Sequence, residues 1–139
     1  MIILDTNVLS ALMKRSQEQQ VLTWLDRQPR SSIWTTSITV LEICFGLNVL
    51  PRGRRRSALM NAFDIVLSEK VDGRIASFDG EAARHAGDLM ALRRQKGRSQ
   101  ELRDTMIAGI VLRSHATLAT RNVSHFDDLS VNIVNPWAA

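Results

Sequence analysis

Three carboxylates lie within apolar stretches of the chain or at the start of one, and their positions make them the first candidates for chemistry. Asp5 is the only charged residue before Lys14, and Glu42 is the only one from residue 38 to residue 51. Asp104 is the only acid from residue 104 to residue 115, and it begins an apolar stripe at helical spacing. An ionised carboxylate among apolar residues is costly unless a cation compensates it. No base lies near Asp5 or Glu42 in sequence, and the three acids together predict a shared metal ion.

Each acid also has an ordinary structural interpretation. Asp5 would cap the helix that follows it. Thr39 and Glu42 have the spacing of a capping box, and Asp104 lies in a first helical turn, where the helix dipole favours an acid. Both interpretations stay open for each acid taken singly.

The residue types narrow the metal and the reaction. Oxygen ligands favour Mg²⁺ or Mn²⁺, and one cysteine with three scattered histidines does not indicate a zinc site. We expect His85 and His115 at the surface or at a helix end. The sequence has neither a Walker-type phosphate loop nor a Ser-His-Asp order. Acids that hold a divalent cation beside a basic surface indicate phosphodiester hydrolysis.

The positive charge is mostly arginine and is clustered. The net charge is +4, and the clusters lie at residues 52–56 and 93–98. Such clusters suit contacts with phosphates. The aromatic content is only 5%, with no tyrosine, so we do not expect a base-stacking platform.

Strands and helices are expected to alternate, which predicts an α/β fold with a parallel sheet covered on both faces. Ligands of such sheets bind beyond the carboxyl ends of the strands, where Asp5 would stand. The helix at 37–50 is apolar on all sides, so we expect it to be buried, with Cys44 an inert core thiol. The expected strands are 2–4, 33–36, 74–78, 117–120 and 131–134. One helix is expected to begin at residue 8. Further helices are expected at 18–28, 37–50, 57–71, 80–97 and 101–115, with an arginine-rich loop at 51–56.

The totals predict one domain, residues 1–139. No apolar run is long enough to span a bilayer, and the N-terminus has no signal-peptide pattern, so we expect a cytoplasmic protein without a membrane segment.

Four segments resemble, in order, the sequence motifs of the PIN-domain ribonucleases. They are residues 3–7 (ILDTN), 37–46 (SITVLEICFG), 104–108 (DTMIA) and 119–122 (ATRN) with the following His125-Phe126; residues 134–137 (VNPW) resemble the end of VapC/FitB-type toxins. The resemblance implies a PIN-like α/β/α sandwich with a central parallel sheet. It implies a Mg²⁺- or Mn²⁺-dependent endoribonuclease, the toxin of a VapBC-type toxin–antitoxin pair, which cleaves cellular RNA and inhibits translation. It also implies a homodimer, a VapB/FitA-like antitoxin as partner and larger complexes of the two.

The resemblance also assigns roles to residues. Asp5, Glu42 and Asp104 match the acidic metal-site positions of the family, and Thr6 and Thr120 match polar positions beside them. We expect Thr120 and Asn122 to orient water or phosphate. RNA contacts are expected from Thr6, Arg54, Arg55, Arg94 and Arg121.

One position departs from the family pattern. Many relatives have an acid where this chain has Asn122, which offers a neutral oxygen but no charge. We therefore expect one firm metal site and a weaker, substrate-assisted second one. Asp127 or Asp128 could replace the missing acid, although we expect both to be exposed to solvent.

Two alternative functions stay open. Loss of the acid at Asn122 could leave a catalytically weakened RNA-binding PIN domain, which blocks translation without cleavage. A phosphotransfer domain with Asp5 as the nucleophile is disfavoured, because no second acid stands two residues after Asp5.

Overall fold

The centre of the molecule is one parallel sheet. The computed structural model describes residues 1–14, 16 and 18–139. In this part of the chain five short strands pair in the order β3-β2-β1-β4-β5, and every neighbouring pair is parallel. This confirms the predicted sheet. The strands are β1 (Ile2–Leu4), β2 (Ile33–Thr36), β3 (Ile75–Ala76), β4 (Thr117–Ala119) and β5 (Ile133–Val134).

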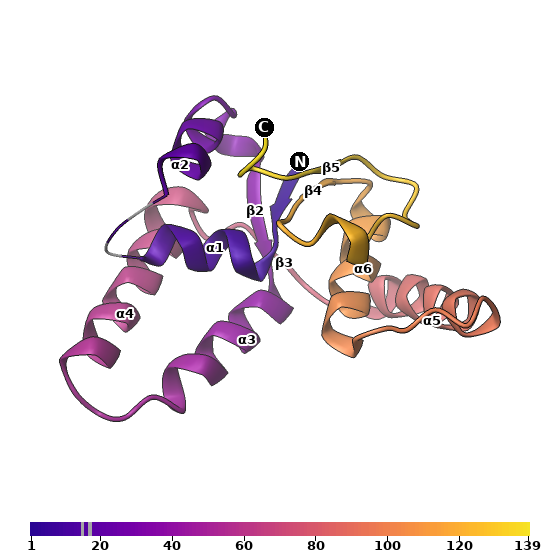
Figure 1. Ribbon diagram of the computed structural model, residues 1–139, viewed down its shortest axis with the longest axis horizontal. Coiled ribbons are helices and arrows are strands. Elements are labelled where there is room, and N and C mark those ends of the chain that lie inside the picture. Colours follow the sequence, from indigo (N-terminus) through magenta and orange to yellow (C-terminus); the bar gives the residue numbers. More distant parts are fainter. Residues whose placement is uncertain (15, 17) are drawn as a thin grey trace.

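Helices cover both faces of the sheet, with α1 to α4 on one side and α5 and α6 on the other (Figure 1). Successive residues of a strand point to opposite faces, and accordingly Leu4 packs in the core under α1 to α4 while Ile3 packs in the core under α5 and α6. The predicted α/β/α sandwich is confirmed. The helices are α1 (Thr6–Met13), α2 (Gln19–Asp26), α3 (Ser37–Asn48), α4 (Arg54–Ile65), α5 (Gly80–Gln95) and α6 (Leu102–Ser114), with short turns η1 (Arg30–Ser32), η2 (Val66–Lys70) and η3 (Val123–His125).

The order of the strands places Asp5 at a point where the chain leaves the sheet in two directions. β1 lies between β2 and β4, so the connections from these strands diverge beyond its carboxyl end. Such divergence opens a crevice at this edge of the sheet. The N–H of Asp5 donates to the Ala119 carbonyl at 2.9 Å, which extends the pairing of β1 with β4 by one residue. Asp5 and Thr120, the first residues after these two strands, therefore stand side by side.

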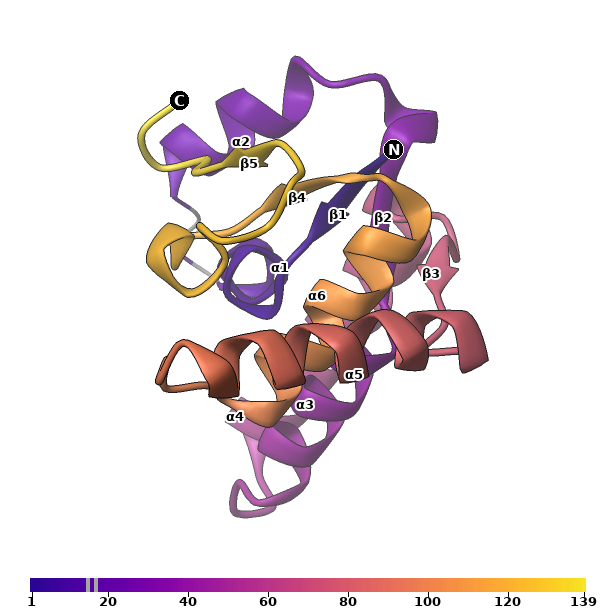
Figure 2. The same cartoon turned by 90° about the vertical axis from the view of Figure 1, so that its right-hand side faces the viewer.

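Helices α5 and α6 form a closely packed pair, which Figure 2 shows from the side. Gly109 of α6 lies against Ala82 and Ala86 of α5, and a methyl group on Gly109 would come within 2.5 Å of the Ala82 carbonyl oxygen. This close approach fixes the position of α6, whose first turn carries Asp104.

The prediction that the helix at 37–50 is buried on all sides is wrong. One face of α3 packs in the core through Ile38, Ile43 and Leu47, but the other carries Phe45, which is 61% exposed. Cys44 is exposed too, so it is not a core thiol. The reason is the path of α3, which leaves the sheet edge and runs outward together with α4 (Figure 1).

The arginine-rich loop expected at 51–56 is shorter than predicted. Helix α4 begins at Arg54, after Gly53, so three of the arginines form its first turn. The helix predicted at 57–71 is not α-helical to its end, because its last part, η2, is a π-helix. No helix in the described part of the chain combines the length and apolar character needed to cross a membrane.

Candidate metal centre

Asp5 is the most enclosed acid of the candidate site, with only 3% of its surface exposed. Its Oδ1 accepts the N–H of Thr6 at 2.8 Å, so it does cap α1. Its Oδ2 accepts the hydroxyl of Thr120 at 2.8 Å and lies 3.4 Å from Nδ2 of Asn7. These donors are all neutral. Within the described residues, the carboxylate has hydrogen bonds but no cation beside it.

The pKa of Asp5 reflects this environment. Burial raises the pKa of Asp5 from 3.8 to about 6, hydrogen bonds from Thr120 and Thr6 work against the rise, and the charges of Asp104 and Glu42 add to it. Asp104 and Glu42 are therefore each close enough to Asp5 to repel its charge. A cation among them would offset both the burial and the repulsion.

Glu42 is connected to Asp5 through Thr6, whose backbone N–H donates to Asp5 and whose hydroxyl donates to Glu42. Thr6 donates its hydroxyl to Oε1 of Glu42 at 3.0 Å, and the hydroxyl of Thr39 lies 3.0 Å from that of Thr6. Because Thr6 gives its proton to Glu42, Thr39 must donate to Thr6. The predicted capping box of Thr39 and Glu42 is absent: Thr36 caps α3 instead and accepts the N–H of Thr39.

Asp104 lies in the first turn of α6 and contacts a histidine that the sequence analysis did not select. Its Oδ2 is 3.0 Å from Nδ1 of His125, which follows β4 in turn η3. Glu101 is the cap of this helix and accepts the N–H of Asp104 at 2.9 Å. His125 stood next to the fourth quoted motif, and that position was the signal that could have identified it.

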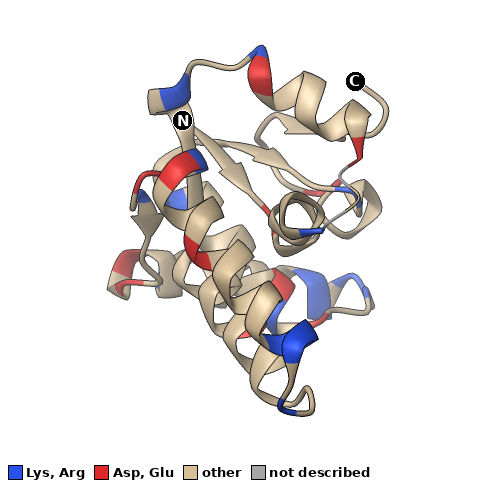
Figure 3. Ribbon diagram, turned by 90° about the vertical axis from the view of Figure 1, so that its left-hand side faces the viewer, with Lys and Arg blue, Asp and Glu red and all other residues tan. Residues whose placement is uncertain are grey.

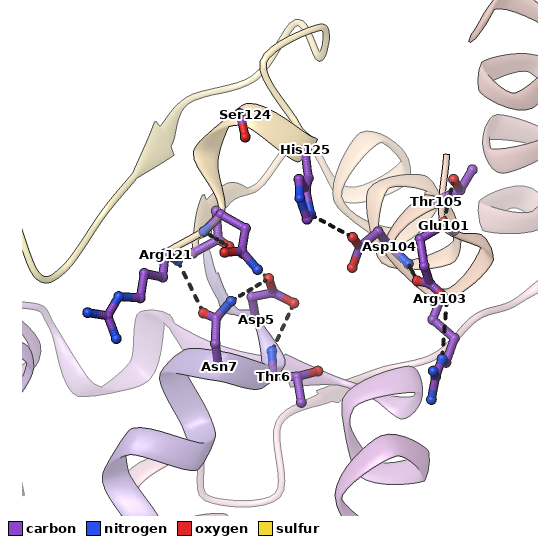
Figure 4. Close-up of polar contacts among 12 residues, drawn as sticks. Asp5, Thr6, Asn7, Glu101, Arg103, Asp104, Thr105, Arg121, Ser124 and His125 are labelled. Atoms are coloured by element: carbon purple, nitrogen blue, oxygen red, sulfur yellow. Dashed lines mark hydrogen bonds and ion pairs between the residues drawn. The ribbon is translucent and has the colours of Figure 1, made fainter. Parts of the chain in front are cut away.

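The described residues have the chemistry of a divalent-cation site but do not form a finished one. Figure 4 shows Asp5, Asp104 and His125 around one region below the turn that carries His125. Within the described residues, no three His, Cys, Asp or Glu side chains are close enough together to form a metal-binding group. Thr120, Thr6 and His125 each contact one of the acids. The donor atoms are nonetheless carboxylate oxygens, and Asp5 is buried with no cation beside it in the described part of the chain. This donor set fits Mg²⁺ or Mn²⁺.

Three polar residues complete the surroundings of Asp5. Thr120 is fully buried, and its hydroxyl accepts the backbone N–H of Asn122 at 3.0 Å. This contact of Asn122 comes from its backbone and leaves the side chain exposed. Asn7, which the sequence analysis did not select, accepts the N–H of Arg121 at 3.1 Å and so connects the segment after β1 to the segment after β4.

In the second arginine cluster, residues 93–98, Arg93 and Arg98 already form ion pairs within the protein. Arg93 is 2% exposed and binds both carboxylate oxygens of Asp128 at 2.8 Å, and Arg98 pairs with Asp127 at 2.9 Å. The prediction that this whole cluster contacts phosphate is wrong for Arg93. The expectation that Asp128 is exposed is also wrong, because its side chain is only 15% exposed. Neither Asp127 nor Asp128 is free to replace the missing acid.

The remaining predicted RNA contacts lie in separate places. The guanidinium of Arg121 stacks over the ring of Trp137, 4.7 Å from its centre, and Trp137 donates its indole N–H to Glu18. Arg94 is exposed on α5. Arg54 and Arg55 begin α4, beyond the outer end of α3, and Figure 3 shows basic residues at that tip, away from the sheet.

Comparison with known proteins gives a consistent result. The PIN domain family matches residues 2–131. The VapC ribonuclease Y4jK of Sinorhizobium fredii is 36% identical over 137 residues, which are 99% of this chain and 98% of the relative. Toxin FitB of Neisseria gonorrhoeae is 28% identical over 137 residues, 99% of each protein. The crystal structure of FitAcB from Neisseria gonorrhoeae superimposes with a TM-score of 0.89 at 28% identity, covering 100% of both chains.

The chain therefore belongs to the PIN-domain family. Within that family its relatives are VapC and FitB proteins, which confirms the resemblance drawn from the four motifs.

Proposed function

We propose that this chain is a divalent-metal-dependent endoribonuclease and the toxin of a VapBC-type pair. The observation that carries the proposal is Asp5, a buried carboxylate with a raised pKa and two further acids within electrostatic reach, and with no cation beside it among residues 1–14, 16 and 18–139. It stands at the carboxyl end of a central parallel strand in a PIN domain. The ribonuclease name of the 36% identical relative supports the reaction.

In this proposal Asp5, Glu42 and Asp104 hold one Mg²⁺ or Mn²⁺, directly or through water. When bound, the cation lowers the pKa of an attacking water and neutralises charge on the scissile phosphate. Asn122 lacks the charge that would hold a second cation firmly, so any second ion depends on the phosphate of the substrate.

The protein groups prepare the acids for this task. The hydroxyls of Thr120 and Thr6 orient the carboxylates of Asp5 and Glu42, and His125 orients Asp104. Hydrogen-bonded neighbours of metal-binding carboxylates fix their direction and are worth roughly 10–100-fold in metal affinity or activity. Thr120 and Asn122 would place water or phosphate, while Arg121, Arg94 and the arginines at the start of α4 would contact the RNA backbone.

The proposed partner is a VapB/FitA-like antitoxin. FitB, the 28% identical relative, is named a toxin. The outer face of α3 supports a protein contact, because Leu41, Phe45 and Val49 are each more than half exposed, and exposed apolar patches commonly mark interaction sites. We further propose that the toxin is a homodimer, that it cleaves cellular RNA and that it thereby inhibits translation.

The test is RNA cleavage by metal-free protein to which Mg²⁺ or Mn²⁺ is added back. We expect wild type to cut only with metal, and Asp5→Asn and Asp104→Asn to be at least about 100-fold slower. The matched control is Asp64→Asn, which makes the same change at an exposed acid of α4 and should cut like wild type. Cleavage at the wild-type rate by folded Asp5→Asn would refute the proposal.

The same experiment decides the second candidate function. Asn122 removes a charge at the fourth motif, which favours a PIN domain that binds RNA without cutting it. RNA that stays intact with excess metal, while the protein still binds it, would establish that alternative.

A further inference from the structure

A pocket of about 570 Å³ lies directly against the Asp104 side of the candidate metal centre. It is lined by residues 98–101, Asp104, Ser124 and His125, together with the buried Arg93. Its volume is within the range of pockets that hold small molecules, roughly 300–1,000 Å³. An RNA whose scissile phosphate lies at the acids has a nucleotide on each side of that phosphate. One of these nucleotides would lie toward this pocket.

The walls of the pocket are held by ion pairs and backbone contacts. Arg98 pairs with Asp127 at 2.9 Å and donates to the carbonyl of Ser124 at 2.7 Å. Arg93 donates to the carbonyl of His125 at 3.0 Å while it binds Asp128. The segment after α5 is thereby tied to the turn that carries Ser124 and His125.

These contacts also determine the charge that the pocket presents. Both cations in its lining, Arg93 and Arg98, are already paired with carboxylates. The other charged lining groups are Glu101 and Asp104, which are acids. A phosphate would therefore find no free cation among the described lining residues and would meet two negative charges. The pocket suits an uncharged group.

The remaining lining groups are neutral and form hydrogen bonds. Ser99 and Ser124 offer hydroxyl groups, and Gln100 offers its amide oxygen, since its Nε2 donates to the Met90 carbonyl at 3.5 Å. The side chain of His125 is 53% exposed. Proteins that read single-stranded RNA stack unpaired bases on aromatic rings, histidine included, and bond the edges of the bases with such side chains. The ring of His125 can stack on a base even though the chain has few aromatic residues.

We propose that this pocket is the subsite for the base and ribose of one unpaired nucleotide next to the scissile phosphate. The ring of His125 forms its stacking surface, and Gln100 and Ser99 read the edge of the base. The subsite gives the enzyme its sequence preference. This inference rests on the proposed ribonuclease function.

The first experiment measures sequence preference with a pool of random RNA. Gln100→Ala is expected to lose a preference of roughly tenfold at one position beside the cut. Gln95→Ala, an exposed glutamine at the end of α5 outside the pocket, is the matched control and should keep the preference. An unchanged preference in folded Gln100→Ala would overturn the proposal.

The second experiment does not need cleavage, so it separates failure of the subsite from failure of the ribonuclease assignment. Adenosine, guanosine, cytidine and uridine are titrated into metal-free protein, and backbone amide signals are followed by NMR. The subsite predicts that at least one nucleoside shifts the signals of residues 98–101 and 124–125, and that Gln100→Ala weakens this response. If the protein cuts no RNA, this titration decides. No shift with any nucleoside, or an equal shift with inorganic phosphate alone, would reject the subsite.

Discussion

The guanidinium of Arg93 and the carboxylate of Asp128 form a buried two-point ion pair between the end of α5 and the segment after η3, with both contacts at 2.8 Å. Arg93 also donates to the hydroxyl of Thr105 at 3.2 Å and to the carbonyl of His125 at 3.0 Å. Thr105 follows Asp104, and His125 contacts Asp104. The pair thus joins the segments that present two groups of the candidate metal centre.

Removal of one partner of this pair should destabilise the fold strongly. Arg93→Met removes the guanidinium that binds Asp128 at two points and leaves only Arg98, 3.7 Å away, beside that carboxylate. Loss of one partner of such a pair costs about 3–5 kcal/mol. The double variant Arg93→Met/Asp128→Leu removes both charges and should recover much of the loss. Urea denaturation at pH 7 measures the free energy of unfolding. Arg94→Met, at the exposed neighbouring position, is the control and should change the free energy of unfolding little. If Arg93→Met and Arg94→Met lowered this free energy equally, the account would be contradicted.

The pair also has a predictable pH dependence. The hydrogen bonds from Arg93 lower the pKa of Asp128, so the ionised carboxylate is favoured in the folded state. The stabilisation from Asp128 is therefore present at neutral pH and is lost as the pH falls through its lowered pKa.

Asp5 should affect stability in the opposite sense. Its pKa is raised from 3.8 to about 6 in the folded chain, so the metal-free protein loses stability as the pH rises from about 4 to about 6, on the order of 2–3 kcal/mol at most. At pH 7 with EDTA, Asp5→Asn should therefore unfold at a higher temperature than wild type, and near pH 4 the two should converge. Thermal unfolding at both pH values is the measurement. If Asp5→Asn were less stable than wild type at pH 7, the charge of Asp5 would not destabilise the fold, and the prediction would be wrong.

Gly109 should be intolerant of a single methyl group. Helix propensity alone predicts that Gly→Ala stabilises a helix by up to about 1 kcal/mol, but the new Cβ would lie 2.5 Å from the carbonyl oxygen of Ala82 and 2.8 Å from Cβ of Ala86. We expect Gly109→Ala to destabilise the chain by about 1–3 kcal/mol. Gly87→Ala is the matched control, because nothing lies within 4 Å of its added Cβ on α5. Stabilisation by both changes would show that α5 and α6 can move apart.

The sequence was informative where an apolar strand runs directly into a polar residue. The apolar strand at 2–4, followed by Asp5, predicted correctly that this acid lies beyond the carboxyl end of a strand in a parallel sheet. That β4 pairs with β1 and brings Thr120 beside Asp5 was visible only in the fold. The apolar pattern of α3 was misleading, because it does not distinguish burial in the core from an apolar face that is exposed on the chain. Phe45 is the clearest instance.

Arg93 shows a signal that was present but not used. It follows Ala82, Ala86 and Leu89 at helical spacing on the buried face of α5, so its position indicated an inward side chain more reliably than its charge indicated RNA. Its partner Asp128 is 35 residues away in the chain, and helical periodicity carries no information about such a pairing. For the same reason the contact of His125 with Asp104 became visible only in the fold.

Binding of Mn²⁺ to the metal-free protein tests the central claim most directly, because it needs no substrate. Isothermal titration of wild type and of the control Asp64→Asn should show one Mn²⁺ per chain, and Asp5→Asn and Asp104→Asn should each bind it at least about tenfold more weakly. Wild-type affinity in both folded site variants would contradict the claim that these acids grip a common ion.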